Sequence, residues 1–479
     1  MTAHRNRFQA VSTLFLILAC ALPCIVFAQT TPVEGTWSGG LDIQGAKLPL
    51  VFNVSLADGV LKATMDSPAQ GVKGIPVAGV SAKNGTLSFD VAVLGGKFEG
   101  LLSADGNKAS GAWMQGGASL PLVLERQSAA FALIRPQEPQ APFPYSTREV
   151  RFEGGASGVS LAGTLTLPEH TSGGNVPAVV MVTGSGPQDR NEFILGHKPF
   201  LVLTDALARR GIASLRWDDR GVGASGGNFA SATTMDFADD ALAALAWLSA
   251  QPGIDSGRMG IIGHSEGGIV APIAAVRDRR VGFIVLLAGP GIRGDKLLLS
   301  QNEAILRASG ASDESISQLN KVNSILYDIV LTSTLKGDAL AVELKSAYID
   351  GIRNVTVLSE KERESAVADA DSAAAQLASP WVGTFLATDP AEWLAKVTIP
   401  VLAINGTKDV QVPWKENLAA IDEALPVPHS PFTRIIPLEG LNHLFQTAGT
   451  GLPDEYGSIT ETFSPAAIDL IVSWIGSLP

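Results

Sequence analysis

The chain has 479 residues, of which 46% are hydrophobic, and its formal net charge is −12 at pH 7. This length accommodates one large domain and a smaller one, since domains average about 150 residues. No cluster of Lys and Arg stands out, so the chain lacks the basic surface by which proteins bind nucleic acid or anionic lipid. We therefore expect no nucleic-acid partner.

The first 28 residues predict a secretory signal peptide. Arg5 and Arg7 precede an apolar stretch over residues 11–27, and small residues stand before a cut after Ala28. We therefore expect a secreted or periplasmic protein, while Cys20 leaves lipidation as an alternative. Both cysteines of the chain fall in this segment, which excludes disulfides and a catalytic cysteine from the mature protein. No later segment is long and apolar enough to span a bilayer.

Residues 29–130 predict a small all-β domain, either a barrel or a sandwich. Short stretches alternate apolar and polar residues and are separated by hairpin signals such as Asn84-Gly85 and Asp105-Gly106. The expected strands include residues 48–54, 87–93 and 120–124. Nothing in this region indicates catalysis.

Residues 131–145 predict a linker, because four prolines in a short stretch disfavour both a helix and a central strand. Residues 146–479 then alternate strand and helix patterns. The expected strands cover residues 178–182 and 213–217, and the expected helices cover residues 201–210 and 235–249. This alternation is typical of an α/β domain with a mostly parallel sheet and helices on both faces.

A helical insertion is predicted within this domain at about residues 291–390. After an expected strand at residues 281–287, the sheet pattern stops and helical signals take over. Ser312 is a suitable N-cap, and Ser359 forms a capping-box pattern with Glu362. Helices inserted here are expected to form a lid over the sheet edge, although a packing subdomain without gating has the same pattern.

The sequence GHSEG at residues 263–267 fits the pattern G-x-S-x-G. Apolar residues 259–262 predict a buried strand before it, and residues 269–276 have helical spacing after it. A strand-to-helix turn this tight needs small flanking residues. It exposes the Ser265 hydroxyl at the carboxyl edge of the sheet and aims the Glu266 backbone N–H at a developing oxyanion. Ser265 is therefore the candidate nucleophile.

A serine nucleophile needs a base that takes its proton and an acid that orients the base. In proteins with G-x-S-x-G between a strand and a helix, these residues come in the chain order Ser, then Asp or Glu as the acid, then His as the base. Asp409 comes just after an expected strand at residues 401–404, and His443 comes in a loop past the next expected strand. We therefore expect Asp409 to orient His443 as the base. His197 is the rival base.

Two further carboxylates, Asp218 and Asp219, are rivals for the role of the acid. Their position along the sheet makes them weaker candidates than Asp409.

A second oxyanion donor is expected in the loop TGSGP at residues 183–187, which follows an expected strand. Gly184 and Gly186 permit close backbone approach and are expected to contact substrate. The Ser185 N–H is the expected donor, with Gly186 as the alternative. One such donor contributes roughly 10² to 10³ in rate.

Four segments of residues 146–479 have distinctive motifs. They are TGSGPQDR at 183–190, DDRGVGAS at 218–225, GHSEGG at 263–268 and SPW at 379–381. Together they resemble the α/β-hydrolase superfamily, and within it the EstD-type bacterial serine esterases. The resemblance implies an α/β-hydrolase fold and a carboxylesterase that favours short acyl chains. It does not extend to the region before the linker.

The sequence thus predicts a serine carboxylesterase that acts on a small-molecule ester through an acyl-enzyme intermediate. A serine peptidase or amidase of the same fold is the first alternative, and a ligand-binding protein with a subsidiary hydrolase domain is the second. No ligand pattern predicts a metal, and the chemistry needs no cofactor. GVGASG at residues 221–226 fits the dinucleotide-binding pattern, but a loop is expected after it where that motif needs a helix. The oligomeric state is left open.

Overall fold

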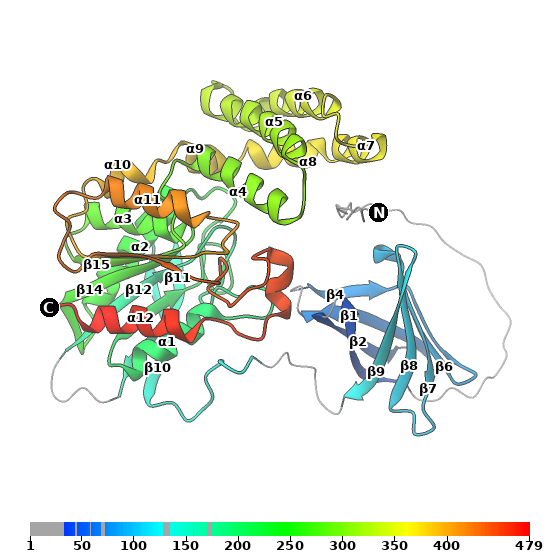
Figure 1. Ribbon diagram of the computed structural model, residues 1–479. Helices are drawn as coiled ribbons and strands as arrows, with labels where there is room; N and C mark the ends of the chain where they lie inside the picture. The colour runs from blue at the N-terminus through cyan, green and yellow to red at the C-terminus, as the bar shows by residue number, and fades with distance from the viewer. Residues whose placement is uncertain are drawn as a thin grey trace. The chain divides into compact units, whose positions relative to one another are not determined.

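The computed structural model describes residues 33–43, 46–57, 59–68, 72–127, 135–156, 158–169 and 175–479. The expected signal peptide lies outside these ranges, as do residues 131–134 of the expected linker. Contacts divide the chain into two compact units, residues 1–134 and 135–479, which Figure 1 shows as ribbons. Residues 135–145, assigned to the linker from the sequence, belong to the second unit.

The first unit is a single antiparallel sheet of nine described strands in the order β4-β3-β2-β1-β9-β8-β7-β6-β5. Its strands are β1 (Gly35–Ile43), β2 (Ala46–Ala57), β3 (Val60–Ser67), β4 (Val72–Val77), β5 (Gly79–Lys83), β6 (Thr86–Val91), β7 (Gly96–Leu102), β8 (Lys108–Gln115) and β9 (Ala118–Gln127). The two ends of the sheet approach each other, because β3 contacts β5 and β4 contacts β6. The sheet is therefore barrel-like, one of the two predicted arrangements.

The hairpin signals act in this unit as predicted. Asn84 and Gly85, both with positive φ (52° and 74°), form the two-residue turn between β5 and β6. The strand expected at 87–93 ends earlier, at Val91, because a 3₁₀ turn (η2, Ala92–Leu94) follows and closes on a left-handed Gly95.

Alternation along the strands packs the interior of the first unit with aromatic rings. Phe98 is fully buried, whereas its neighbours Lys97 and Glu99 are exposed. The rings of Phe52 and Phe89 stack with centroids 4.2 Å apart. Side chains therefore fill this interior.

The second unit contains an eight-stranded sheet in the order β10-β11-β13-β12-β14-β15-β16-β17. Its strands are β10 (Tyr145–Glu153), β11 (Ser160–Pro168), β12 (Val176–Val182), β13 (Ala213–Trp217), β14 (Ile254–His264), β15 (Val281–Leu287), β16 (Val401–Gly406) and β17 (Arg434–Leu438). The pairs β10–β11 and β11–β13 are antiparallel and the others are parallel. This confirms the predicted α/β-hydrolase fold, in which six parallel strands share one carboxyl edge.

Helices cover both faces of this sheet (Figure 1). The helices α1 (Pro199–Arg209) and α12 (Pro465–Gly476) pack on one face, and α2 (Thr234–Ser249), α3 (Gly267–Arg277) and α11 (Trp414–Ala424) pack on the other. Alternation along β12 divides its side chains accordingly. Val179 and Met181 join the α1 and α12 core, while Val180 and Val182 join the α2 and α3 core.

Seven helices between β15 and β16 form a cap, as the interrupted sheet pattern predicted. They are α4 (Gly294–Ala308), α5 (Asp313–Thr332), α6 (Gly337–Arg353), α7 (Glu360–Ala368), α8 (Ala370–Leu377), α9 (Pro380–Ala387) and α10 (Pro390–Leu394). Ser312 caps α5, and Ser359 forms the predicted capping box with Glu362. The cap has its own core around Val322, Leu326 and Leu344.

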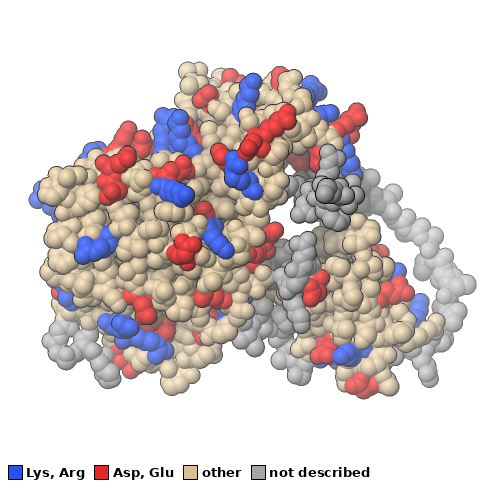
Figure 2. Space-filling model, in the orientation of Figure 1, with Lys and Arg blue, Asp and Glu red and all other residues tan. Residues whose placement is uncertain are grey.

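Charges on the described surface are mixed. Figure 2 shows Lys and Arg interspersed with Asp and Glu on the face drawn. Among the described residues, no helix is long and apolar enough to cross a bilayer.

Candidate active site

The GHSEG segment forms a tight turn between β14 and α3. Ser265 sits at the turn with φ of 51°, in the left-handed region that costs energy for a non-glycine residue. A Cβ on Gly267 would lie 2.3 Å from the Val182 carbonyl oxygen, and one on Gly268 would lie 2.5 Å from Gly289 Cα. Only glycine fits at these positions, and the close packing holds Ser265 at the carboxyl edge of the sheet.

Asp409 and His443 are brought together by the loops after β16 and β17. His443 Nδ1–H donates to Asp409 Oδ2 over 2.8 Å. The other carboxylate oxygen accepts the backbone N–H groups of Gln411 (2.8 Å) and Val412 (2.9 Å). Because the Asp409 side chain is fully buried, both oxygens are fixed, and Nε2 is the imidazole nitrogen left to accept a proton.

Ser265 and His443 line the same cavity, whose volume is about 240 Å³. No hydrogen bond joins their side chains within the described residues; such contacts often tighten only when substrate binds. Much of the apolar wall comes from cap helices α4 and α9, through Leu297, Leu298, Trp381 and Phe385. The structure thus places the predicted nucleophile and base together, under the cap.

The predicted oxyanion loop borders this cavity. Gly184 and Ser185 line it, whereas Gly186 is not among the lining residues. Neither the Ser185 N–H nor the Glu266 N–H donates to another described residue. Ser185 lines the cavity, whereas Glu266 is not among its lining residues. The Gly184 N–H is already engaged, because it donates to Glu192 Oε1 over 2.8 Å.

A buried Glu192–His264 pair supports the site and was not predicted. His264 Nδ1–H donates to Glu192 Oε1 over 2.8 Å, and Nε2–H donates to the His443 carbonyl oxygen over 2.9 Å. Burial lowers the pKa of His264, but the charge and hydrogen bond of Glu192 outweigh it and raise this pKa above its usual value. The pair therefore connects the loop of His443 and the loop of Gly184 to the end of β14.

The rival base, His197, is a buried side chain away from the cavity. Its ring nitrogens contact Thr462 Oγ1 (2.9 Å) and the Tyr456 carbonyl (3.0 Å). Burial and the nearby charge of Arg135 lower its pKa to about 4. This environment indicates a structural histidine.

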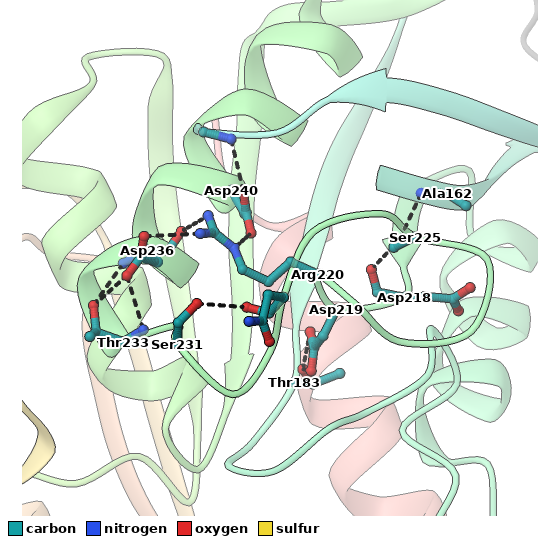
Figure 3. Close-up of polar contacts among 12 residues, drawn as sticks. Ala162, Thr183, Asp218, Asp219, Arg220, Ser225, Ser231, Thr233, Asp236 and Asp240 are labelled. Carbon is teal, nitrogen blue, oxygen red and sulfur yellow. Dashed lines mark hydrogen bonds and ion pairs between the residues drawn. The ribbon is translucent and has the colours of Figure 1, made fainter. Parts of the chain in front are cut away.

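The rival acids also have other partners. Asp218 pairs with Arg190 at 2.8 Å. Asp219 accepts from Thr183 Oγ1 and from the Gln188 N–H, and Figure 3 shows its contact with Thr183. Neither carboxylate bonds to His443 among the described residues.

The GVGASG segment stays a loop. Arg220, just before it, bonds to Asp236 and Asp240 of α2, as Figure 3 shows. The next helix begins only at Thr234, so the segment lacks the helix that a dinucleotide-binding turn requires.

Comparisons with known proteins agree with this architecture. A family model described as X-Pro dipeptidyl-peptidase (S15 family) matches residues 157–435. Esterase EstD of Thermotoga maritima is 26% identical over 299 residues, which cover 62% of this chain and 61% of that protein. An uncharacterized Pseudomonas aeruginosa protein, PA2218, is 30% identical over 154 residues, covering 31% of this chain and 39% of that one. The chain thus spans less than two thirds of the length of these relatives.

Solved structures are similar at low sequence identity. The crystal structure of PA2218 covers 73% of this chain and 99% of its own, with 16% identity and a TM-score of 0.41. That of the alpha/beta hydrolase GrgF from Penicillium sp. sh18 covers 62% and 91%, with 18% identity and a TM-score of 0.40. The family match and the similarity to EstD confirm the predicted resemblance to α/β-hydrolase esterases.

Proposed function

The chain belongs to the X-Pro dipeptidyl-peptidase (S15) family, and we propose that it is a serine hydrolase that cleaves short-chain carboxylic esters. One observation carries the proposal. A serine on a strained turn lines the same cavity as a histidine whose Nδ1 is held by a buried carboxylate. This is the arrangement that activates a serine hydroxyl.

In the proposed reaction, Ser265 Oγ attacks the ester carbonyl carbon while its proton passes to His443 Nε2. The Ser185 and Glu266 N–H groups hold the oxyanion. The ester C–O bond then breaks, and the alcohol leaves with the proton from His443. Water next attacks the acyl-enzyme, its proton passes to His443, and the carboxylic acid is released with Ser265 restored.

The cavity lining supports a small, uncharged acyl group. Its volume of about 240 Å³ is below the roughly 300 to 1,000 Å³ of typical drug-sized sites. Leu297, Leu298 and Phe385 provide an apolar wall. We therefore propose acetyl to butyryl esters as the preferred substrates.

The family description favours a second candidate, a peptidase that releases X-Pro dipeptides. Such a substrate brings a free α-ammonium group, which needs an acidic partner. Glu192 is the one carboxylate among the residues lining the cavity, and its Oε1 already accepts from Gly184 and His264. This engagement favours the ester over the peptide.

The ligand-binding alternative rests on the first unit. Its interior is occupied by fully buried rings, including those of Trp37, Phe52 and Phe89. A ligand would therefore have to bind on the outer face of the sheet. The arrangement of Ser265, His443 and Asp409 in the second unit supports hydrolysis more strongly than the first unit supports ligand binding.

Hydrolysis of p-nitrophenyl acetate, butyrate and octanoate, alongside Ala-Pro-p-nitroanilide, tests the proposal. We expect ester turnover to fall with chain length and to drop by about 10⁴-fold or more in Ser265→Ala. Ser146→Ala, at an exposed serine of β10, is the matched control. Anilide turnover equal to ester turnover would move the assignment to the peptidase, and retained activity in Ser265→Ala would refute the mechanism.

We also propose that the protein is exported. The basic, apolar and small-residue regions of residues 1–28 support this. Amino-terminal sequencing of protein recovered from a bacterial periplasm is expected to begin at Gln29. A sequence that begins at Met1 in the cytoplasmic fraction would contradict it.

A further inference from the structure

The side chain of Glu266 joins three separate parts of the hydrolase unit. Trp381 Nε1–H of cap helix α9 donates to Oε1 (2.9 Å) and Oε2 (3.0 Å). Ser185 Oγ–H of the oxyanion loop donates to Oε2 over 2.9 Å. Thr234 Oγ1–H, at the start of α2, donates to Oε1 over 2.7 Å.

This carboxylate is buried, with 2% of the residue exposed, and burying a carboxylate is costly. Burial raises the pKa of Glu266 above its usual value, and the hydrogen bonds from Thr234, Trp381 and Ser185 offset this rise only in part. The nucleophile turn itself uses only the backbone of Glu266, so the turn does not account for a carboxylate there.

The partners of Glu266 are the groups that shape the site. Ser185 carries one of the two oxyanion donors, and its side chain is anchored by Glu266. Trp381 lines the cavity and stacks on Phe385 with centroids 5.0 Å apart. The carboxylate thus lies between the cap wall of the cavity and the loop that holds the oxyanion.

We propose that Glu266 is a positioning residue through which the cap fixes the oxyanion hole. Trp381 holds the Glu266 carboxylate, and the carboxylate holds Ser185 with its N–H aimed at the reacting carbonyl. The cap is then part of the catalytic apparatus as well as a wall of the cavity. This inference rests on the proposed function, because it assigns a role in the same reaction.

Variants that remove one hydrogen bond at a time test the coupling. Trp381→Phe removes the indole N–H and keeps an aromatic ring, and Ser185→Ala removes the hydroxyl and keeps the backbone N–H. We expect each to lower kcat for p-nitrophenyl butyrate about 10- to 100-fold with KM changed less than about threefold, because the lost interaction acts on the transition state. The double variant is expected to lose clearly less than the product of the two single losses, because both act through Glu266.

Three further variants separate positioning from packing. Trp393→Phe, in α10 of the cap and outside this cavity, is the matched control and is expected to keep wild-type kcat. Glu266→Gln keeps an oxygen for Trp381 and Thr234 and a polar group beside Ser185, so it is expected to retain more kcat than Glu266→Ala. Melting temperatures of all variants establish that each one folds.

A second readout does not depend on the natural substrate. A fluorophosphonate phosphonylates an activated serine: a P–O bond forms at Ser265 and fluoride leaves. Its rate also depends on the oxyanion hole. We expect the labelling rate to fall in Trp381→Phe and Ser185→Ala in proportion to kcat.

The outcomes distinguish the two proposals. Wild-type protein that is labelled at Ser265 but hydrolyses no ester contradicts the proposed substrate and leaves the labelling series to decide the coupling. Unchanged kcat and labelling in folded Trp381→Phe, or losses that multiply in the double variant, overturn the coupling. Absence of labelling at Ser265 in folded wild-type protein overturns both.

Discussion

Replacing Asp409 by Asn tests the proposed base through a single atom. Two backbone N–H groups, of Gln411 and Val412, point at Oδ1, so the side-chain oxygen of Asn must stay there. The Asn NH₂ group then faces His443 Nδ1, where Asp409 now accepts a hydrogen bond over 2.8 Å. Nδ1 is forced to accept, the ring proton moves to Nε2, and Nε2 can no longer take the proton of Ser265.

The expected loss is about 10⁴-fold in kcat, the size found when a triad carboxylate becomes an amide and the histidine tautomer is wrong. This corresponds to about 5 kcal/mol of transition-state stabilisation. Because the replacement is isosteric, keeps two of the three hydrogen bonds and only reverses the direction of the third, we expect KM for p-nitrophenyl butyrate to change little.

Steady-state kinetics of Asp409→Asn should be measured beside a control at another Asp–His pair. Asp422 lies 3.7 Å from His429, and its side chain is 60% exposed, so Asp422→Asn is expected to leave kcat unchanged. If folded Asp409→Asn kept more than about a tenth of the wild-type kcat, the argument from the tautomer of His443 would be refuted.

Three further predictions concern stability. Gly268→Ala places a Cβ 2.5 Å from Gly289 Cα, backbone against backbone, and is expected to cost at least about 1 to 3 kcal/mol in urea unfolding; an unchanged midpoint would show that the turn can relax. Arg135→Ala removes a guanidinium that donates to the carbonyls of residues 195, 196, 457 and 459, and is expected to cost about 3 kcal/mol or more in thermal unfolding; a smaller loss would mean that water replaces it. Burial, aided by the charges of Glu266 and Glu192, raises the pKa of Asp219 from 3.8 to about 8, so between these values the unfolded chain has lost a proton that the folded chain keeps. The free energy of unfolding of the wild type therefore falls across that window. The free energy of unfolding of Asp219→Asn, relative to the wild type, is expected to rise by up to about 1.4 kcal/mol per pH unit until pH 8 and no further. Urea unfolding of both proteins at pH 5, 6.5, 8 and 9.5 measures this difference, and a difference that stays constant with pH would contradict the raised pKa.

The sequence was enough to predict the placement of residues that come directly after a strand. Ser265, Asp409 and His443 each follow one of the six parallel strands of the sheet, so the carboxyl edge that these strands share brings the three loops to the same end. The order of the strands along the chain was enough to infer this. The glycine turns of the first unit were equally visible, because a positive φ is a local requirement.

Hydrogen-bond partners that lie far apart in the chain could not be predicted from the sequence. Trp381 lies 115 positions from Glu266, and the SPW motif gave no sign of what its indole contacts. Glu192 lies in a loop with no periodic pattern, and only the fold places it between Gly184 and His264. His197 and His443 are both buried, and only their hydrogen-bond partners distinguish them: Thr462 and the Tyr456 carbonyl for His197, and Asp409 for His443.

The cap joins the sheet at two neighbouring strands, β15 and β16, which are hydrogen-bonded to each other at both ends, for example through Ile284 N–H and the Pro400 carbonyl. Evolution can therefore lengthen, shorten or replace the cap without disturbing the sheet. A lineage that exchanges the cap loses the hydrogen-bond donor at position 381, and the buried carboxylate of Glu266 without that donor destabilises the fold. We expect these two positions to covary among related sequences, so that the pair marks which family members inherited this particular cap.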